Sequence, residues 1–325
     1  MSDQSSSYRI EGAATLLSSL VHGGDHAGTV GYLRREKIIG PAGQPLDIPV
    51  VSGNAFRGIL RDHAAHLLWA ALGSPPLPVQ VFHLLWSGGA LAKAGAGHVL
   101  GARQLAEVRR LIPVVSLFGG SGAGKIIEGK LMVGKMLPIC VETAHLVPSD
   151  LVSDPAGLVS VWDMLQIEEF TRRDDTKRDL LHPAIAGLSP GQLETPPQEG
   201  AALLTVEPHQ PAVEDDTDGP AQQMRYGVET IAAGTRLHWW MALRRITPVE
   251  RSLIAGAVDS WAEAGGHIGG RSATGHGRLR LDVHQWQHST PTTTVGQALD
   301  VQRDHLAEHV AEHGDAIVEA LGWFA

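Results

Sequence analysis

The sequence feature that most constrains the fold is a pair of glycine-bearing loops, at residues 48–61 and 269–278, far apart in the chain. In the first loop, an extended run bounded by prolines turns through Ser52 and Gly53 into an amphipathic segment. This pattern predicts a helix whose free N-terminal N–H groups point at whatever lies in front. The second loop has four glycines among several side-chain donors, which permits close backbone approach. Each loop alone fits an ordinary cap or turn equally well, but both also suit contact with a polyanion.

The segments around these loops alternate between strand and helix patterns. Strands are expected at 8–21, 34–39, 114–118, 130–139, 235–244 and 278–286, and helices at 54–72, 104–111, 248–264 and 295–324. Their order is strand, helix, strand pair, long insertion, strand, helix, strand. From it we predict a ferredoxin-like (RRM-like) α+β fold whose βαββαβ core carries large insertions.

Composition narrows the class of protein. A chain of 325 residues can bury a substantial core, and its single cysteine, Cys140, excludes an internal disulfide and fits a reducing, cytoplasmic compartment. The net charge of −9 argues against a surface that is positive throughout. Local Arg and Lys clusters leave open both a basic groove in an acidic body and ordinary surface charge. No run of about 20 apolar residues occurs, so no membrane contact is expected.

Two motifs suggest enzymes but fail in context. Gly119, Gly124 and Lys125 match the spacing of a nucleotide-binding P-loop, but Ile126 replaces the Ser or Thr that would bind Mg²⁺, and a strand pattern follows instead of a helix. We expect a turn there, with Lys125 as a phosphate contact, and an ATPase is the weakest alternative. The 17 histidines contain no set with recognisable metal-ligand spacing, so no metal or cofactor is expected.

Four ordered motifs carry a resemblance to a known family. They are the loop-helix signature at 48–61, Leu117 to Gly119 with 129–133, the run at 229–235, and the closing glycine-rich loop at 269–278. Across roughly residues 8–286 the chain resembles the RAMP-superfamily backbone subunit of class 1 CRISPR effector complexes, most closely the type IV subunit. The resemblance implies a palm at 1–290 with inserted fingers (about 73–112) and a thumb (about 163–226), followed by a helical tail at 291–325.

The resemblance also implies the function and the site. Such subunits oligomerise along the CRISPR guide RNA in a helical filament with other effector subunits, and they present its bases to a target nucleic acid. The residues expected at the RNA are Arg34, Arg35, Ser52, Asn54, Arg57, Arg61, Lys125, Arg172, Arg173, Arg225, Tyr226, Gly270, Arg271, Ser272 and His276.

A departure from the family pattern favours a subunit without catalytic activity. Target-cleaving relatives carry an aspartate in the loop after the first strand. That position falls near Arg34 or Arg35 here, and Asp25 comes about ten residues too early. The alternative is a metal-independent endoribonuclease that processes guide RNA, with His22, His26 or His276 as general acid and base.

Overall fold

The computed structural model describes residues 6–89, 100–122, 124–152, 154–172, 224–285, 291–292, 294–301 and 303–324. Its main sheet is built around two long antiparallel strands, β1 (Ser6–Leu16) and β12 (Arg236–Ile246). The strand order is β15-β14-β1-β12-β8, and β13 and β9 pair with β1 and β12 beside this path. The shorter strands are β8 (Leu131–Val133), β9 (Leu137–Pro138), β13 (Leu279–Leu281), β14 (Val283–Gln285) and β15 (Pro291–Thr292).

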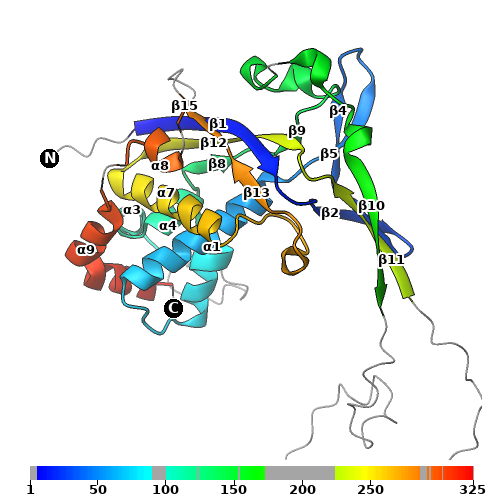
Figure 1. Ribbon diagram of the computed structural model, residues 1–325. Coiled ribbons are helices and arrows are strands. Elements are labelled where there is room, and N and C mark those ends of the chain that lie inside the picture. Colours follow the sequence, from blue (N-terminus) through cyan, green and yellow to red (C-terminus); the bar gives the residue numbers. More distant parts are fainter. Residues whose placement is uncertain are drawn as a thin grey trace, which may run out of the picture.

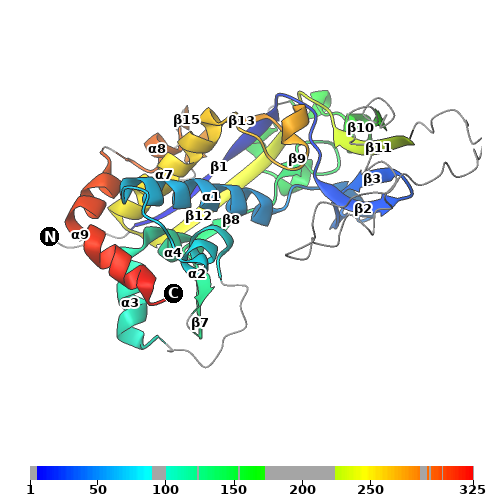
Figure 2. The same ribbon diagram turned by 90° about the horizontal axis from the view of Figure 1, so that it is seen from below.

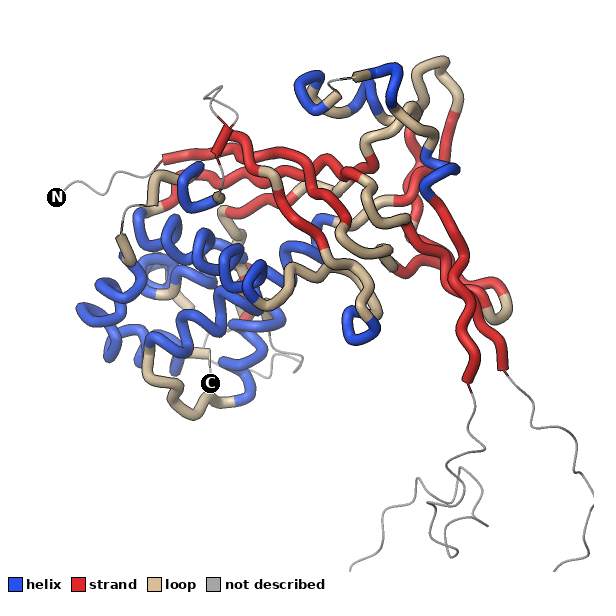
Figure 3. Tube along the Cα trace, in the orientation of Figure 1, coloured by secondary structure: helices blue, strands red, loops and turns tan. Residues whose placement is uncertain are grey.

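Two long helices cover one face of this sheet (Figures 1 and 3). They are α1 (Gly53–Ala71) and α7 (Pro248–Glu263). Both begin where the sequence predicts: Ser52 caps α1, and α7 has Pro248 in its first turn and a capping box made by Thr247 and Glu250. Between helices and sheet, the ring of Phe56 meets those of Trp239 and Trp261 edge-on at centroid distances of 6.5 and 5.1 Å. The core therefore forms where α1, α7 and β12 converge.

The remaining helices pack around α1 and α7. They are α2 (Val79–Phe82), the π-helix η1 (His83–Ser87), α3 (Ala102–Leu111), α4 (Pro113–Phe118), α8 (Val295–Ala298) and α9 (His305–Gly322). The predicted helices at 104–111 and 295–324 are found, and α9 lies against α3 and α7 with Ile317 and Leu321 in the main core. Residues 90–99 of the expected fingers lie outside the described part of the chain.

The strand predicted at 114–118 is wrong, because these residues form most of α4. All six residues of α4 are buried, and Pro113 occupies its first turn. A short, fully apolar run suits either a buried strand or a buried helix, and periodicity alone does not separate the two. The proline, which favours the first turn of a helix, is the local signal that decides here.

A second sheet extends away from the first. Its order is β10-β11-β3-β2, from β10 (Leu165–Arg172), β11 (Met224–Ile231), β3 (Val30–Leu33) and β2 (Gly23–Ala27). Figure 1 shows β10 and β11 as a projecting ribbon at the base of the expected thumb, of which residues 173–223 lie outside the described ranges. Two hairpins complete the strands: β4 (Arg35–Ile39) with β5 (Pro45–Pro49), and β6 (Gly120–Gly122) with β7 (Lys125–Ile127).

The architecture confirms the predicted α+β class. Along the chain, the main elements run β1, α1, β8, a long insertion, β12, α7 and then β13 with β14. Short 3-10 helices fill the insertion and the last glycine-rich loop: η2 (Ala144–Leu146), η3 (Ser149–Leu151), η4 (Pro155–Gly157), η5 (Val161–Met164) and η7 (Ser272–Thr274). None of the described helices is both long enough and apolar enough to cross a membrane.

Candidate nucleic-acid interface

The two glycine-bearing loops meet on the segment that leaves β1. The Gly270 amide donates to the Val21 carbonyl at 2.8 Å, and the Ser52 amide donates to Nε2 of the adjacent His22 at 3.2 Å. Gly269 makes this approach possible, since its φ is +81° and an added Cβ would lie 2.2 Å from the Val21 oxygen. Two loops that are more than 200 positions apart in sequence thus border one short segment.

The N-terminus of α1 forms one side of this junction. The Ser52 hydroxyl accepts a hydrogen bond from the Ala55 amide at 3.2 Å, Asn54 is exposed, and no acidic residue stands in the first turn. The positive end of the helix dipole is therefore not neutralised by its own side chains. Gly53 is required here, because a Cβ would lie 2.2 Å from the Val133 carbonyl oxygen.

His22 links the junction to the second sheet. Burial, followed by the nearby positive charge of Arg34, lowers the pKa of this histidine. A neutral ring is what the geometry needs, because Nε2 accepts the Ser52 amide proton. In the alternative predicted from the sequence, His22 acts as a general acid or base. In the structure, however, its Nε2 already accepts a hydrogen bond from the Ser52 amide.

Arg271 lies on an aromatic platform supplied by the β10–β11 ribbon. Its guanidinium carbon is 4.4 Å from the ring centroid of Phe170 and 5.6 Å from that of Tyr226. The two rings face each other across the ribbon, stacked at 5.8 Å with an interplanar angle of 21°. Arg271 itself has a left-handed backbone, with φ 60° and ψ 29°. The platform therefore holds a cation against two stacked aromatic rings, and cations and aromatic rings are the groups that bind phosphates and stack bases.

His276 and Glu168 connect the glycine-rich loop to the same ribbon. His276 Nε2 lies 3.0 Å from Glu168 Oε2, and the Thr230 hydroxyl donates to Glu168 Oε1 at 3.1 Å. Burial raises the pKa of Glu168, but hydrogen bonds from Ser19, His276 and Thr230 outweigh it, so the pKa is lowered overall. The His276 ring is buried, faces Glu168 and holds the loop in place, and its predicted contact with RNA stays a prediction.

Arg34 and Arg35 have different environments. Arg35 forms an ion pair with the buried Glu229 at 2.5 Å, and Glu229 also accepts the Leu33 amide at 3.0 Å. This pair joins β4 to β11. The Arg34 side chain is exposed beside His22, and the Arg225 side chain is exposed on β11. The charges of Arg34 and Arg225 are therefore exposed to solvent, whereas the charge of Arg35 is paired with Glu229 within the protein.

Arg57 and Arg61 point at the end of α4. Arg57 Nη2 donates to the Phe118 carbonyl at 2.5 Å, and Arg61 donates to the Gly119 carbonyl. Burial, together with the neighbouring Arg57, lowers the pKa of Arg61 to about 10. The C-terminal carbonyls of a helix attract cations. The buried Arg61 thus serves the fold in this structure, and its predicted contact with an RNA phosphate stays a prediction.

The other predicted residues fall into separate places. Gly270 and Ser272 are exposed in the glycine-rich loop. Lys125 begins β7, as the strand pattern predicts, on the side of the molecule away from β10 and β11 (Figure 2). The Arg172 side chain and Arg173 lie outside the described part of the chain.

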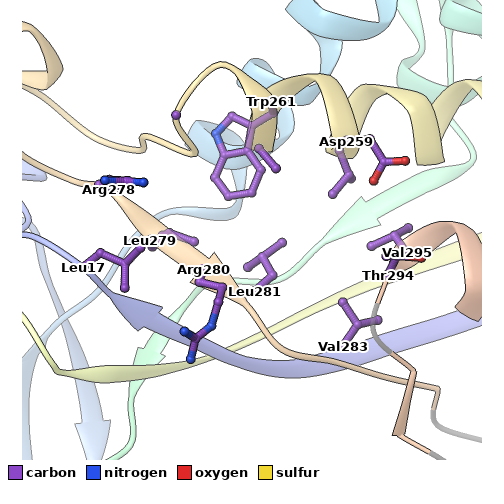
Figure 4. A pocket seen from close by; sticks show the side chains of 13 residues that line it. Leu17, Asp259, Trp261, Arg278, Leu279, Arg280, Leu281, Val283, Thr294 and Val295 are labelled. Atoms are coloured by element: carbon purple, nitrogen blue, oxygen red, sulfur yellow. The ribbon is translucent and has the colours of Figure 1, made fainter.

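A groove of about 360 Å³ continues from the glycine-rich loop along β13 (Figure 4). Trp261 and Leu279 contribute apolar walls, while Arg278 and Arg280 lie beside it. Arg278 and Arg280 are both exposed. Asp259 also lines the groove and Arg280 is paired with Asp282 at 3.6 Å, so Arg278 is the lining arginine whose charge borders the loop most directly.

Sequence reasoning missed Phe170, Glu168 and Glu229 as site residues. All three lie on β10 or β11, and their partners belong to distant segments. The alternation on these strands is visible in the sequence, but only the pairing of Phe170 with Tyr226 shows which face meets Arg271. A one-residue shift of that register would place Phe170 opposite another residue.

Comparison with known proteins gives a structural match over most of the chain. No protein-family model matches the chain, and no curated protein matches it either. Among solved structures, the chain matches a chain described as "Type IV-B CRISPR Complex" with a TM-score of 0.54 and 26% sequence identity. The match covers 91% of this chain and 100% of the solved one. The predicted kinship with a subunit of a type IV CRISPR complex is therefore confirmed.

Proposed function

We propose that the chain is a non-catalytic RAMP-type backbone subunit that oligomerises along guide RNA, holds its phosphates and presents its bases to a target. The observation that carries the proposal is the junction at residues 20–22. There the N-terminus of α1, the glycine-rich loop and the Arg271 platform border one surface.

The topology supports a ferredoxin-like palm. Taken by sequence order, β1 is the first strand, β8 the second, β12 the third and β13 with β14 the fourth. Their order across the sheet is fourth, first, third, second, all antiparallel, with α1 and α7 as the two connecting helices. This is the βαββαβ arrangement with both helices on one face.

The chemistry of the junction suits single-stranded RNA without regard to sequence. Backbone amides, a helix N-terminus and arginines hold phosphates, which carry no sequence information. The aromatic pair of Phe170 and Tyr226 offers faces on which any base can stack. A subunit that must accept any guide needs this combination.

Replacement of the exposed Arg34 and Arg225 tests whether this surface binds RNA. In the double variant Arg34→Glu with Arg225→Glu, two exposed cations near the junction become anions while Arg35 and Arg271 keep their internal contacts. We expect the purified variant to lose its RNA, measured as the ratio of absorbance at 260 and 280 nm, and to keep its circular dichroism spectrum. The matched control is Arg303→Glu, a side chain 63% exposed beside α9. Full RNA retention by the folded double variant would refute the assignment.

Asp25 provides the test of the non-catalytic role. It is the only carboxylate between residues 17 and 34, and it lies exposed on β2. We expect no cleavage when the purified complex is incubated with a target complementary to its guide. Cleavage that disappears in Asp25→Asn would show instead a target-cleaving enzyme. Cleavage of precursor guide RNA that disappears in His26→Ala would favour the endoribonuclease.

A further inference from the structure

A closed circuit of side-chain contacts joins the glycine-rich loop to strand β10. His276 of the loop contacts Glu168 on β10, and Arg271 of the same loop lies on Phe170, two residues further along the same face of the strand. Thr274 closes the circuit, because its hydroxyl oxygen is 3.0 Å from the Arg271 carbonyl oxygen and 3.2 Å from Nδ1 of His276. These five residues are together called the loop clamp.

The hydrogen bonds of Thr274 determine where one proton of His276 lies. A threonine hydroxyl has a single proton, and a carbonyl oxygen has none. The contact of 3.0 Å with the Arg271 carbonyl is therefore a hydrogen bond that Thr274 donates. Toward His276 the hydroxyl oxygen must then accept, so Nδ1 of His276 carries a proton.

Glu168 determines the state of the other ring nitrogen. Its Oε1 accepts hydrogen bonds from Thr230 at 3.1 Å and from the Gln166 amide at 3.2 Å. Burial raises the pKa of Glu168, but hydrogen bonds from Ser19, His276 and Thr230 lower it overall, so the carboxylate is ionised at neutral pH and can only accept. Nε2 of His276, 3.0 Å from Oε2, must therefore donate as well. With both nitrogens protonated, the ring is an imidazolium cation.

The surroundings of His276 suit a cation. The residue is only 5% exposed, and a buried charge requires a partner of opposite sign. Glu168 supplies that charge. The other groups that can carry charge at this loop are Arg271, which is positive, and His267, whose Nδ1 lies 2.9 Å from the His276 carbonyl. On β11, Tyr226 faces the Arg271 guanidinium. The ion pair with Glu168 is thus what keeps the buried ring charged.

We infer that His276 is a positively charged positioning residue, which fixes the backbone of Arg271 through Thr274 and ties the glycine-rich loop to Glu168. This inference rests on the proposed function, since Arg271 is one of the residues expected at RNA phosphates. His276 contributes through Arg271, which it holds on the ring of Phe170 in a left-handed backbone conformation.

RNA affinity should then depend on the charge of His276. A neutral imidazole can donate through one nitrogen only, so deprotonation removes the bond to Thr274 or the bond to Glu168. Histidine changes charge between about pH 5 and pH 8. Above this range the loop adopts the binding arrangement less often, and the apparent affinity falls by the same fraction. We expect RNA to bind about fivefold more weakly at about pH 8.5 than at about pH 6, the effect of one lost hydrogen bond.

The variant His276→Gln tests this pH dependence. Glutamine stays neutral, so the variant should bind RNA weakly at both pH values and show a smaller response to pH than the wild type. The matched control is His145→Gln, because His145 contacts only the Ile39 carbonyl and should leave the response unchanged. Fluorescence anisotropy of a labelled single-stranded RNA, at constant salt, measures the affinities. An identical pH response in wild type and His276→Gln would overturn the inference.

Thr274 provides a second variant that leaves the ion pair intact. Its side chain is exposed, so the fold does not depend on it. Thr274→Val removes the hydroxyl and should weaken RNA binding about fivefold at about pH 6, whereas Thr274→Ser restores the hydroxyl and should bind like the wild type. Wild-type affinity in Thr274→Val, with an unchanged circular dichroism spectrum, would contradict the role of Thr274.

A spectroscopic measurement reports the charge of His276 without using RNA binding. Solid-state NMR of the sedimented protein, labelled with ¹⁵N-histidine, distinguishes protonated from unprotonated ring nitrogens, and the His276 signals are those missing from His276→Gln. We expect both nitrogens to be protonated at about pH 6.5. An unprotonated nitrogen in a protein that binds RNA would overturn this inference alone. A wild-type protein that binds no RNA at any pH would overturn the proposed function.

Discussion

Arg271 combines a strained backbone with a charged platform, so two substitutions at this position separate the two effects. The left-handed conformation, with φ 60°, costs a residue other than glycine about 1–2 kcal/mol. The cation–π contacts with Phe170 and Tyr226, at 4.4 and 5.6 Å, each contribute about 0.5–1 kcal/mol. Arg271→Ala keeps the strain and loses both contacts, so it should destabilise the protein by about 1–2 kcal/mol.

Arg271→Gly loses the same contacts but removes the strain. Glycine also gains chain entropy in the unfolded state, which lowers stability by about 0.5–1 kcal/mol. After this offset, we expect the glycine variant to be more stable than the alanine variant by roughly 1 kcal/mol. The free energy of unfolding from urea titration, monitored by circular dichroism, measures the difference.

Arg271→Ala and Arg271→Gly should differ in stability but not in RNA affinity. Under the proposed function each variant loses one phosphate contact per copy, so the slope of log K against log salt should fall by about 0.7 for single-stranded RNA in each. The measurement is fluorescence anisotropy of a labelled single-stranded RNA over a salt series. Equal stabilities of the two variants would refute the strain argument, and an unchanged salt slope in both would refute the phosphate contact.

Three further outcomes follow from the described contacts. Gly53→Ala places a Cβ 2.2 Å from the Val133 carbonyl oxygen, so the free energy of unfolding should fall by about 1–3 kcal/mol; equal urea midpoints for wild type and variant would contradict this. Gly58→Ala, exposed in the same helix with nothing within 4 Å, should instead stabilise by about 0.5–1 kcal/mol, and a loss of stability would be inconsistent with an open site. Burial raises the pKa of Glu168, but the hydrogen bonds from Ser19, His276 and Thr230 lower it overall, so these bonds together stabilise fully above the ordinary pKa of 4.5 and are lost as pH falls through the folded-state value. The stability advantage of wild type over Glu168→Gln should therefore shrink as pH drops below 4.5, whereas an advantage independent of pH would speak against an ionised Glu168.

Much of the fold was predictable because its signals are local. The caps at Ser52 and Thr247 and the apolar spacing that follows them determine where α1 and α7 begin. The order of strands and helices indicated the α+β class, and the glycines at 269–277 indicated a loop of close backbone approach. These features depend on neighbours in sequence, which act whether or not the rest of the chain is folded.

The site was predictable in outline only. Ser52 and Gly270 do lie at one junction, as the element order implied. The sequence did not indicate the internal contacts of Arg61 and His276, because a charged or polar side chain in a motif does not reveal whether it is already bonded to a carbonyl or a carboxylate inside the protein. That depends on packing across large sequence separations.

The sequence by itself determined the two long helices α1 and α7, the glycine-dependent turns and the resemblance to type IV CRISPR subunits, all through local pattern and ordered motifs. Only the tertiary structure decided that the carbonyls of Phe118 and Gly119, at the end of α4, accept hydrogen bonds from Arg57 and Arg61. It also decided that Phe170 and Tyr226 share the face that meets Arg271. The physical reason is that strand register and the bonding partners of side chains are set by contacts between distant segments, which no local pattern encodes.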